Sequence, residues 1–427
     1  MPWRIIGKLG QQKEGPPHVL YQLHELQRSI LHPLSHLASA GAHLYTNPYS
    51  PLSYTPFSRR LAATFDLVHR LGKDYEKPIF GLETTSVDGH EVMVTERIVA
   101  EKPFCNLMHF ERQFVGSPRR AADPKILLVA PMSGHHATLL RDTVRALLPN
   151  HEVFITDWID ARMVPLNMGP FHLDDYVEYV CDFIRLLSPD LNVISVCQPT
   201  VPVLAAVSLM ATANDPASPR TIIMMGGPID ARKSPTSVND LAVEKPLHWF
   251  ENHVIYNVPY KYPGYLRKVY PGFLQHAGFV AMNPGRHLTS HYDYYLQLIK
   301  GDGESADSHR AFYDEYNAVL DLAAEFYLDT IRVVFQDHLL PKGQWTVRGK
   351  PVRPQDITKT ALLTIEGELD DISGAGQTQA AHNLCTGIPA HRQEDLVVAQ
   401  AGHYGIFSGR RWREQVAPKI ADFIRSH

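Results

Sequence analysis

The chain has 427 residues, of which 44% are hydrophobic and 20% charged, and its formal net charge is −4. This composition is typical of an ordinary globular protein and supplies neither a basic stripe for nucleic acid nor a polybasic cluster for an anionic membrane. Four scattered cysteines without a CxxC pair favour a reducing compartment, and the N-terminus shows no secretory signal. We therefore expect a cytoplasmic protein of one or two domains with no integral membrane segment, and the composition leaves a homo-oligomer open.

The N-terminal part is predicted to be helical. Residues 1–18 are expected to form a disordered extension, and residues 19–85 a helical segment. Its first helix is indicated by Leu20, Leu23, Leu26 and Ile30, which follow helical spacing. A proline-punctuated loop and a second helix come next. A membrane-surface role is open for these helices, but the missing basic face favours helices that pack on a core.

The remainder of the chain alternates short apolar runs with helical segments. Two extended strands are expected first, within residues 91–115, with a turn near residues 102 and 103. Continuous apolar runs then predict parallel strands covered by helices on both faces. We expect this core over residues 86–239 and 351–427, where "GQTQAAHNLC" is one of the predicted helices. An insertion at 240–350 holds 19 of the 41 aromatic residues and is predicted to be a cap, or lid.

The stretch "LNVISVCQPTVPVLAAVSLMA" (191–211) places Cys197 between a buried strand and a helix. A nucleophile at such a turn is the elbow of α/β-hydrolases, usually G-x-S-x-G. Here Ser195 and Pro199 replace the glycines. The helix N-terminus would favour a thiolate, and the main-chain N–H of Gln198 would face an oxyanion. A buried structural cysteine is the alternative for this stretch taken alone.

Two later positions supply the partners of a triad. An α/β-hydrolase orders its nucleophile, acid and histidine in that sequence along the chain. Asp370 follows the predicted strand "ALLTIEG", with neighbouring Asp371 as a rival acid. His403 lies in a glycine-containing loop after the strand "DLVVAQA". The three together predict an α/β-hydrolase fold and a Cys197–His403–Asp370 site.

The first strand–helix loop, "LLVAPMSGHHATLL", is where a second oxyanion donor belongs. The main-chain N–H of Met132 or Ser133 is the candidate. His135 and His136 would either contact substrate or cap the following helix. No H-E-x-x-H, Walker A or G-x-G-x-x-G pattern is present, so we expect no metal, nucleotide or other cofactor.

Several segments resemble the intracellular polyhydroxyalkanoate (polyhydroxybutyrate) depolymerases of bacteria, over nearly the whole chain from about residue 19. The resemblance lies in "TNPYSPLSYTPFSRRLAA", "VAPMSGHHATLLRDTV", "SVCQPTVPVLAA", "EGELDDISGAGQT" and "AGHYGIFSGRRW". It implies an enzyme that cleaves ester bonds of stored poly(3-hydroxybutyrate) granules in the cytoplasm, releasing oligomers or 3-hydroxybutyrate. It also implies a cysteine nucleophile at Cys197, with Asp370 as the acid and His403 as the base.

Two other functions remain open from the sequence. The same acyl-cysteine would serve an acyltransferase, either by thiolysis with CoA or as a relative of the polymer synthases. A granule-coat protein with an inactive hydrolase fold is the third candidate. The products formed with and without CoA, and the reactivity of the thiol at Cys197, distinguish these functions.

Overall fold

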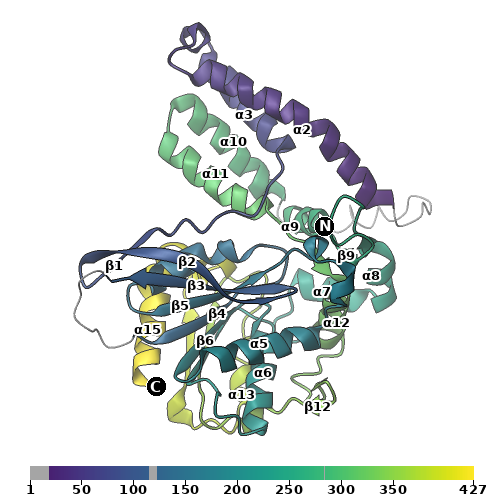
Figure 1. The fold of residues 1–427 in the computed structure, drawn as a ribbon, viewed down its shortest axis with the longest axis vertical. Helices are drawn as coiled ribbons and strands as arrows, with labels where there is room; N and C mark the ends of the chain where they lie inside the picture. Colours follow the sequence, from purple (N-terminus) through teal and green to yellow (C-terminus); the bar gives the residue numbers. More distant parts are fainter. Residues whose placement is uncertain (1–18, 115–122, 283) are drawn as a thin grey trace.

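In the computed structural model, residues 19–114, 123–282 and 284–427 are described, so the expectation for residues 1–18 lies outside these ranges. Within them a nine-stranded sheet forms the centre of the molecule, in the order β1-β2-β3-β5-β4-β6-β7-β13-β14 (Figure 1). Its strands are β1 (Thr84–Val87), β2 (His90–Lys102), β3 (Cys105–Gln113), β4 (Lys125–Val129), β5 (Glu152–Trp158), β6 (Leu191–Val196), β7 (Thr221–Met225), β13 (Ala361–Gly367) and β14 (Gln393–Val398).

The sheet is parallel from β5 to β14, whereas β1, β2 and β3 join its edge in antiparallel pairs. Every residue of β6 and β13 is buried, as the continuous apolar runs predict for strands covered on both faces. The covering helices include α4 (Arg141–Leu147), α5 (Leu173–Leu187), α6 (Thr200–Thr212) and α15 (Ala417–Ser426). Strands β2 to β14 follow the order of an α/β-hydrolase, so the predicted fold is confirmed.

The chain between β7 and β13 leaves the sheet and forms a mainly helical region that lies beyond one end of it (Figure 1). This region begins at the sixth strand of the hydrolase order. Its elements are α7 (Ser237–Glu244), α8 (Leu247–His253), β8 (Tyr256–Asn257), β9 (Lys268–Tyr270), α9 (Gly272–Met282), α10 (Pro284–Lys300), α11 (Gly303–Asn317), β10 (Leu322–Ala323), α12 (Ala324–Thr330), a π-helical turn (Ile331–Gln336), β11 (Thr346–Val347) and β12 (Lys350–Pro351).

One predicted helix is much shorter in the structure. The segment "GQTQAAHNLC" forms only α13 (Ala381–Leu384), preceded by turns. The main-chain N–H groups of Gly376, Thr378 and Gln379 donate to the buried carboxylate of Glu366 instead of to helical carbonyls. The carboxylate competes for the donors that the first helical turn would use, and the helix therefore begins later.

The N-terminal helices form as predicted, as α2 (Val19–Thr46) and α3 (Ser58–Gly72), but their packing differs from the expectation. Leu20, Leu23, Leu26 and Ile30 are between 43% and 60% exposed. The prediction that this apolar face packs on a core is therefore wrong. The buried residues of α2 lie on its opposite side. One of them is Tyr21, whose hydroxyl donates a hydrogen bond to Asp321 at 2.5 Å.

None of the helices in the described ranges has both the length and the hydropathy needed to cross a bilayer.

Candidate active site

Cys197 occupies a strained turn between β6 and α6. Its φ of 69° is left-handed, a conformation that is uncommon for a residue with a side chain. The turn is fixed on both sides, because the N–H of Cys197 donates to the carbonyl of Met225 at 2.7 Å and its carbonyl accepts from the N–H of Thr200 at 3.1 Å. Pro199 has helical backbone angles and caps α6, which accommodates proline at this position. The sulfur is thus held at the carboxyl end of a central strand.

His403 connects Cys197 with Asp370. Its Nδ1 lies 2.8 Å from Oδ2 of Asp370, and its imidazole also hydrogen-bonds the Cys197 side chain, for which Nε2 is the remaining ring nitrogen. Asp370 lies three residues beyond β13, and its Oδ1 accepts the N–H groups of Ile372 and Ser373 at 2.9 Å each. The predicted rival, Asp371, is exposed. The structure therefore brings Cys197, His403 and Asp370 together at the ends of three strands and leaves Asp371 outside.

The surroundings of His403 favour its protonated form. The imidazole is buried, which by itself lowers the pKa because it disfavours the charged ring. The electrostatic effect of Cys197, together with the hydrogen bond that His403 donates to Asp370, outweighs that cost and raises the pKa of His403 to about 10. Such a shift describes an imidazolium held between the Cys197 side chain and the Asp370 carboxylate.

The main-chain groups predicted as oxyanion donors lie in two loops at the same sheet edge. Met132 is buried and Ser133 half-buried in the loop after β4, and Gln198 is buried in the turn after Cys197. Within the described part of the chain, the N–H groups of Met132, Ser133 and Gln198 donate to no protein acceptor. Their role as oxyanion donors stays a prediction, and it would give these N–H groups the acceptor that buried donors rarely lack.

His135 and His136 are both buried, and burial lowers their pKa to about 4 and about 3, which keeps the two rings neutral. His136 stands at the cap position of the 3₁₀ turn Ala137–Leu140, but its side chain makes no capping hydrogen bond. His135 packs against Tyr316 of α11, with ring centroids 5.4 Å apart. Helix capping is therefore excluded for the His136 side chain, whereas contact with substrate stays a prediction for both.

Sequence reasoning missed the glycine pair after β7. A Cβ on Gly227 would lie 1.9 Å from Oγ1 of Thr200 and 2.4 Å from the Cys197 carbonyl oxygen. Gly226 has a φ of 56°, and a Cβ there would lie 3.3 Å from the His403 ring and 3.4 Å from the Asp370 carboxylate. Both positions therefore need glycine for the three side chains to meet. The signal in the sequence was "MMGGP", two glycines directly after a buried strand.

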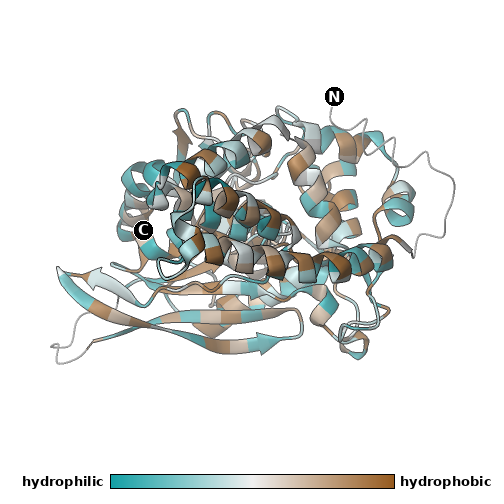
Figure 2. Ribbon diagram, turned by 90° about the horizontal axis from the view of Figure 1, so that it is seen from above, coloured by the Kyte–Doolittle hydropathy of each residue, from teal (hydrophilic) through white to brown (hydrophobic). Residues whose placement is uncertain are grey.

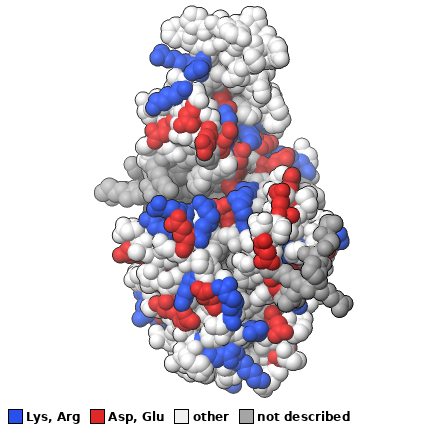
Figure 3. Space-filling model, turned by 90° about the vertical axis from the view of Figure 1, so that its left-hand side faces the viewer, with Lys and Arg blue, Asp and Glu red and all other residues white. Residues whose placement is uncertain are grey.

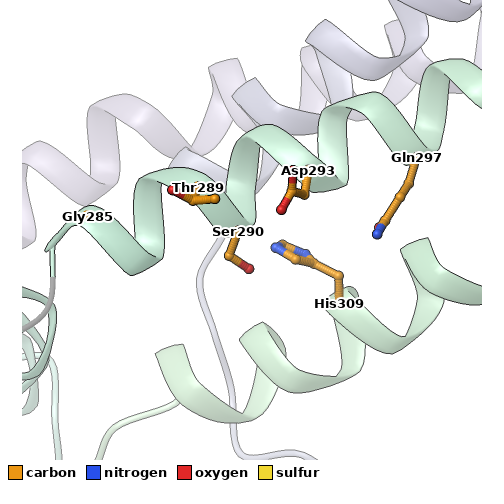
Figure 4. Close-up of a pocket in the computed structure, with 6 residues that line it drawn as sticks. All are labelled: Gly285, Thr289, Ser290, Asp293, Gln297 and His309. Atoms are coloured by element: carbon orange, nitrogen blue, oxygen red, sulfur yellow. The ribbon is translucent and has the colours of Figure 1, made fainter.

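The described residues also form a hollow apart from the candidate catalytic set. A hollow of about 470 Å³ lies between α10 and α11 (Figure 4), away from the strand ends that carry Cys197, His403 and Asp370. It is lined by Gly285, Thr289, Ser290, Asp293, Gln297 and His309. Among the described residues, no group of three or more His, Cys, Asp or Glu side chains is arranged to hold a metal ion.

The strand order and the groups at the strand ends define an enzyme of the α/β-hydrolase fold. Residues 226–427 match the family described as PHB de-polymerase C-terminus, where PHB denotes polyhydroxybutyrate. This match supports assigning the chain to the PHB depolymerase family, and the protein is a carboxylic-ester hydrolase. The resemblance seen in the sequence is thereby confirmed for the C-terminal part.

Solved structures with a similar chain course are distant in sequence. A monoacylglycerol lipase from Paleococcus ferrophilus has 12% identity and a TM-score of 0.41, over 72% of this chain and 96% of its own. A thermophilic esterase from Thermogutta terrifontis has 13% identity and a TM-score of 0.38, over 81% of this chain and 97% of its own. No curated protein sequence matches the chain.

Proposed function

We propose that the protein hydrolyses the ester bonds of stored poly(3-hydroxybutyrate) in the cytoplasm, at the granule surface, and releases oligomers or 3-hydroxybutyrate. Cys197 is the nucleophile, His403 the base and Asp370 the residue that orients it. The observation that carries the proposal is the continuous hydrogen-bonded set formed by these three side chains. They follow three strands in the chain order of an α/β-hydrolase triad.

The reaction proceeds through an acyl-enzyme. His403 takes the proton of the Cys197 thiol, and the thiolate attacks the ester carbonyl carbon. The N–H groups of Gln198 and of Met132 or Ser133 stabilise the oxyanion, and the imidazolium of His403 then protonates the departing alkoxide. A thioester remains on Cys197. Water gives a proton to His403, attacks the thioester carbonyl, and releases the acid as the thiol is re-formed.

We further propose that residues 240–350 act as a cap over this site, on a core formed by residues 86–239 and 351–427. A hydrogen bond supports the position of the cap beside the loop after β4, because the N–H of Leu320 in the insertion donates to the carbonyl of Gly134 at 2.7 Å. His135 and Val319 form a β-bridge beside it. The aromatic residues of the insertion would bind an apolar, uncharged polyester by amphipathic contacts, with His135 and His136 facing the chain.

The decisive experiment is hydrolysis of amorphous poly(3-hydroxybutyrate) granules by the native enzyme and by Cys197→Ala. We expect loss of at least about 10³-fold in rate, with a circular dichroism spectrum that still shows a folded protein. Substantial remaining activity would show that another residue attacks the ester. Cys181→Ala is the matched control, because this thiol is buried away from the strand ends, against the Ala206 carbonyl of α6.

Product analysis tests the acceptor. Free oligomers or 3-hydroxybutyrate formed without CoA are expected for hydrolysis. Acyl-CoA as the main product in the presence of CoA would instead assign the acyl-cysteine to a transferase.

A further inference from the structure

Helix α2 and the loop after it present an apolar surface that carries no formal charge of its own and is bordered by the exposed Arg59 and Arg60 of α3. Residues 29–58 contain no Lys, Arg, Asp or Glu, although such residues make up 20% of the chain. Large side chains in this stretch are nevertheless exposed, among them Leu37 at 69%, Tyr49 at 94% and Phe57 at 68%. We define the charge-free surface as Ile30, Leu34, Leu37, Leu44, Tyr49 and Tyr54, and leave out Phe57 because the guanidinium of Arg60 lies over its ring, 5.6 Å from the centroid.

The packing of α2 explains why this side is left uncovered. Its inner side holds Tyr21, Ser35 and Ala38, which are buried against the rest of the molecule. Its two formal charges, Glu25 and Arg28, lie near the N-terminal end and are paired, Arg28 with Asp74 at 2.8 Å. No charge of α2 is therefore available to the outer side, where the apolar residues recur at helical spacing.

The pictures show the same surface at one end of the molecule's longest axis. Helices α2 and α3 stand at the top of Figure 1, beyond α10 and α11. Seen from above, the long helix in front carries hydrophobic residues at intervals along its length (Figure 2). The corresponding top of the space-filling view has few charged side chains, whereas blue and red residues are mixed over the lower part (Figure 3).

We propose that the charge-free surface docks the enzyme onto the surface of the polyester granule, an inference that rests on the proposed function. Large exposed apolar patches mark interaction sites. A polyester offers apolar groups and uncharged ester oxygens, so contact with it requires no desolvation of a charge. Exposed tyrosines suit such a partner, because each ring is apolar and its hydroxyl donates to an ester carbonyl. An anionic phospholipid surface attracts lysine and arginine clusters instead, and residues 29–58 contain neither.

The test separates docking from catalysis. Leu34→Gln/Leu37→Gln is placed in the Cys197→Ala background and sedimented with protein-free amorphous poly(3-hydroxybutyrate) granules. We expect the affinity for granules to fall at least about tenfold, since two partly buried leucine contacts are lost. Leu186→Gln on α5 is the control for Leu34→Gln, because the two leucines are 55% and 54% exposed. This control should bind as the parent does.

The same double substitution in the active enzyme should leave hydrolysis of a water-soluble 3-hydroxybutyrate oligomer within about twofold, because neither leucine belongs to the catalytic set. Unchanged granule binding by the folded double variant would overturn the docking proposal. Equal binding of the parent to phosphatidylglycerol vesicles would also overturn it. The proposal would likewise be overturned if the protein formed a concentration-dependent dimer that the double substitution abolished while granule binding persisted. Docking without any ester cleavage by the native enzyme would refute the proposed function and leave the docking surface intact.

Discussion

Replacing Asp370 by asparagine should disable the enzyme through the tautomer of His403. The Asp370 side chain is 1% exposed, and its Oδ1 accepts two main-chain N–H groups at 2.9 Å. In Asp370→Asn those two donors still require an oxygen, which fixes the amide orientation and directs its NH₂ at Nδ1 of His403. The imidazole must then accept at Nδ1 and carry its proton on Nε2, toward Cys197. It can no longer take the thiol proton.

The expected loss is about 10³- to 10⁴-fold in kcat, or about 4 to 5.5 kcal/mol of transition-state stabilisation, as for the same change in serine triads. Initial rates on a soluble 3-hydroxybutyrate ester measure it, with circular dichroism as the check on folding. Asp371→Asn is the control, and because Asp371 is exposed its rate should stay within about twofold of the native rate. The reasoning fails if Asp371→Asn is the more damaging change, or if Asp370→Asn keeps more than about a tenth of the native kcat.

Four further outcomes follow from contacts at the site and elsewhere in the fold. Gly227→Ala should destabilise the fold by about 1 to 3 kcal/mol in thermal unfolding, whereas Gly278→Ala, with open space around its Cβ, should not. Equal stability of the two variants would contradict the close approach of Gly227 to Thr200 and the Cys197 carbonyl. At pH 6, iodoacetamide should label Cys197 well before the three buried cysteines, and His403→Asn should slow this labelling at least about tenfold. A labelling rate unaffected by that change would exclude activation of the thiol by His403. The pKa of His403 is raised from 6.5 to about 10, so protonated His403 should stabilise the fold fully below about pH 6.5 and lose this effect as the pH rises through 10. The difference in Tm between the native enzyme and His403→Asn should therefore shrink over this pH range. Tyr21→Phe removes a donor from a buried carboxylate and should cost about 1 to 3 kcal/mol, and a change in Tm no larger than that of an exposed tyrosine would refute it.

Much of the fold was predictable because its signals are local. The apolar runs that become β4, β6, β7 and β13 are buried on both faces, so the residues of each run alone indicate a buried strand. The positions of Cys197, Asp370 and His403 were predictable for a related reason. Cys197 directly follows β6, Asp370 lies three residues beyond β13 and His403 five residues beyond β14, and the carboxyl ends of parallel strands meet at one edge of the sheet.

What the sequence could not predict depends on contacts between distant segments. The direction in which the leucines of α2 point is decided by Tyr21, whose partner Asp321 lies 300 residues away. The shortened helix at α13 is decided by Glu366, a carboxylate inside a strand that binds the N–H groups of the next segment. Helical periodicity describes the amphipathic pattern of a segment but does not say which face another segment will cover.

The elbow itself shows how a distant contact replaces a local rule. A G-x-S-x-G elbow keeps small residues beside the nucleophile, and this chain has Ser195 and Pro199 there. Ser195 is fully buried, and its hydroxyl donates to the carbonyl of Ile223 on β7. The space that the turn needs comes from the same neighbouring strand, where Gly227 admits the Cys197 carbonyl and Gly226 admits the His403 ring. The glycines required for close approach thus follow β7 rather than β6, so an elbow that departs from its motif still holds a left-handed cysteine at the strand end.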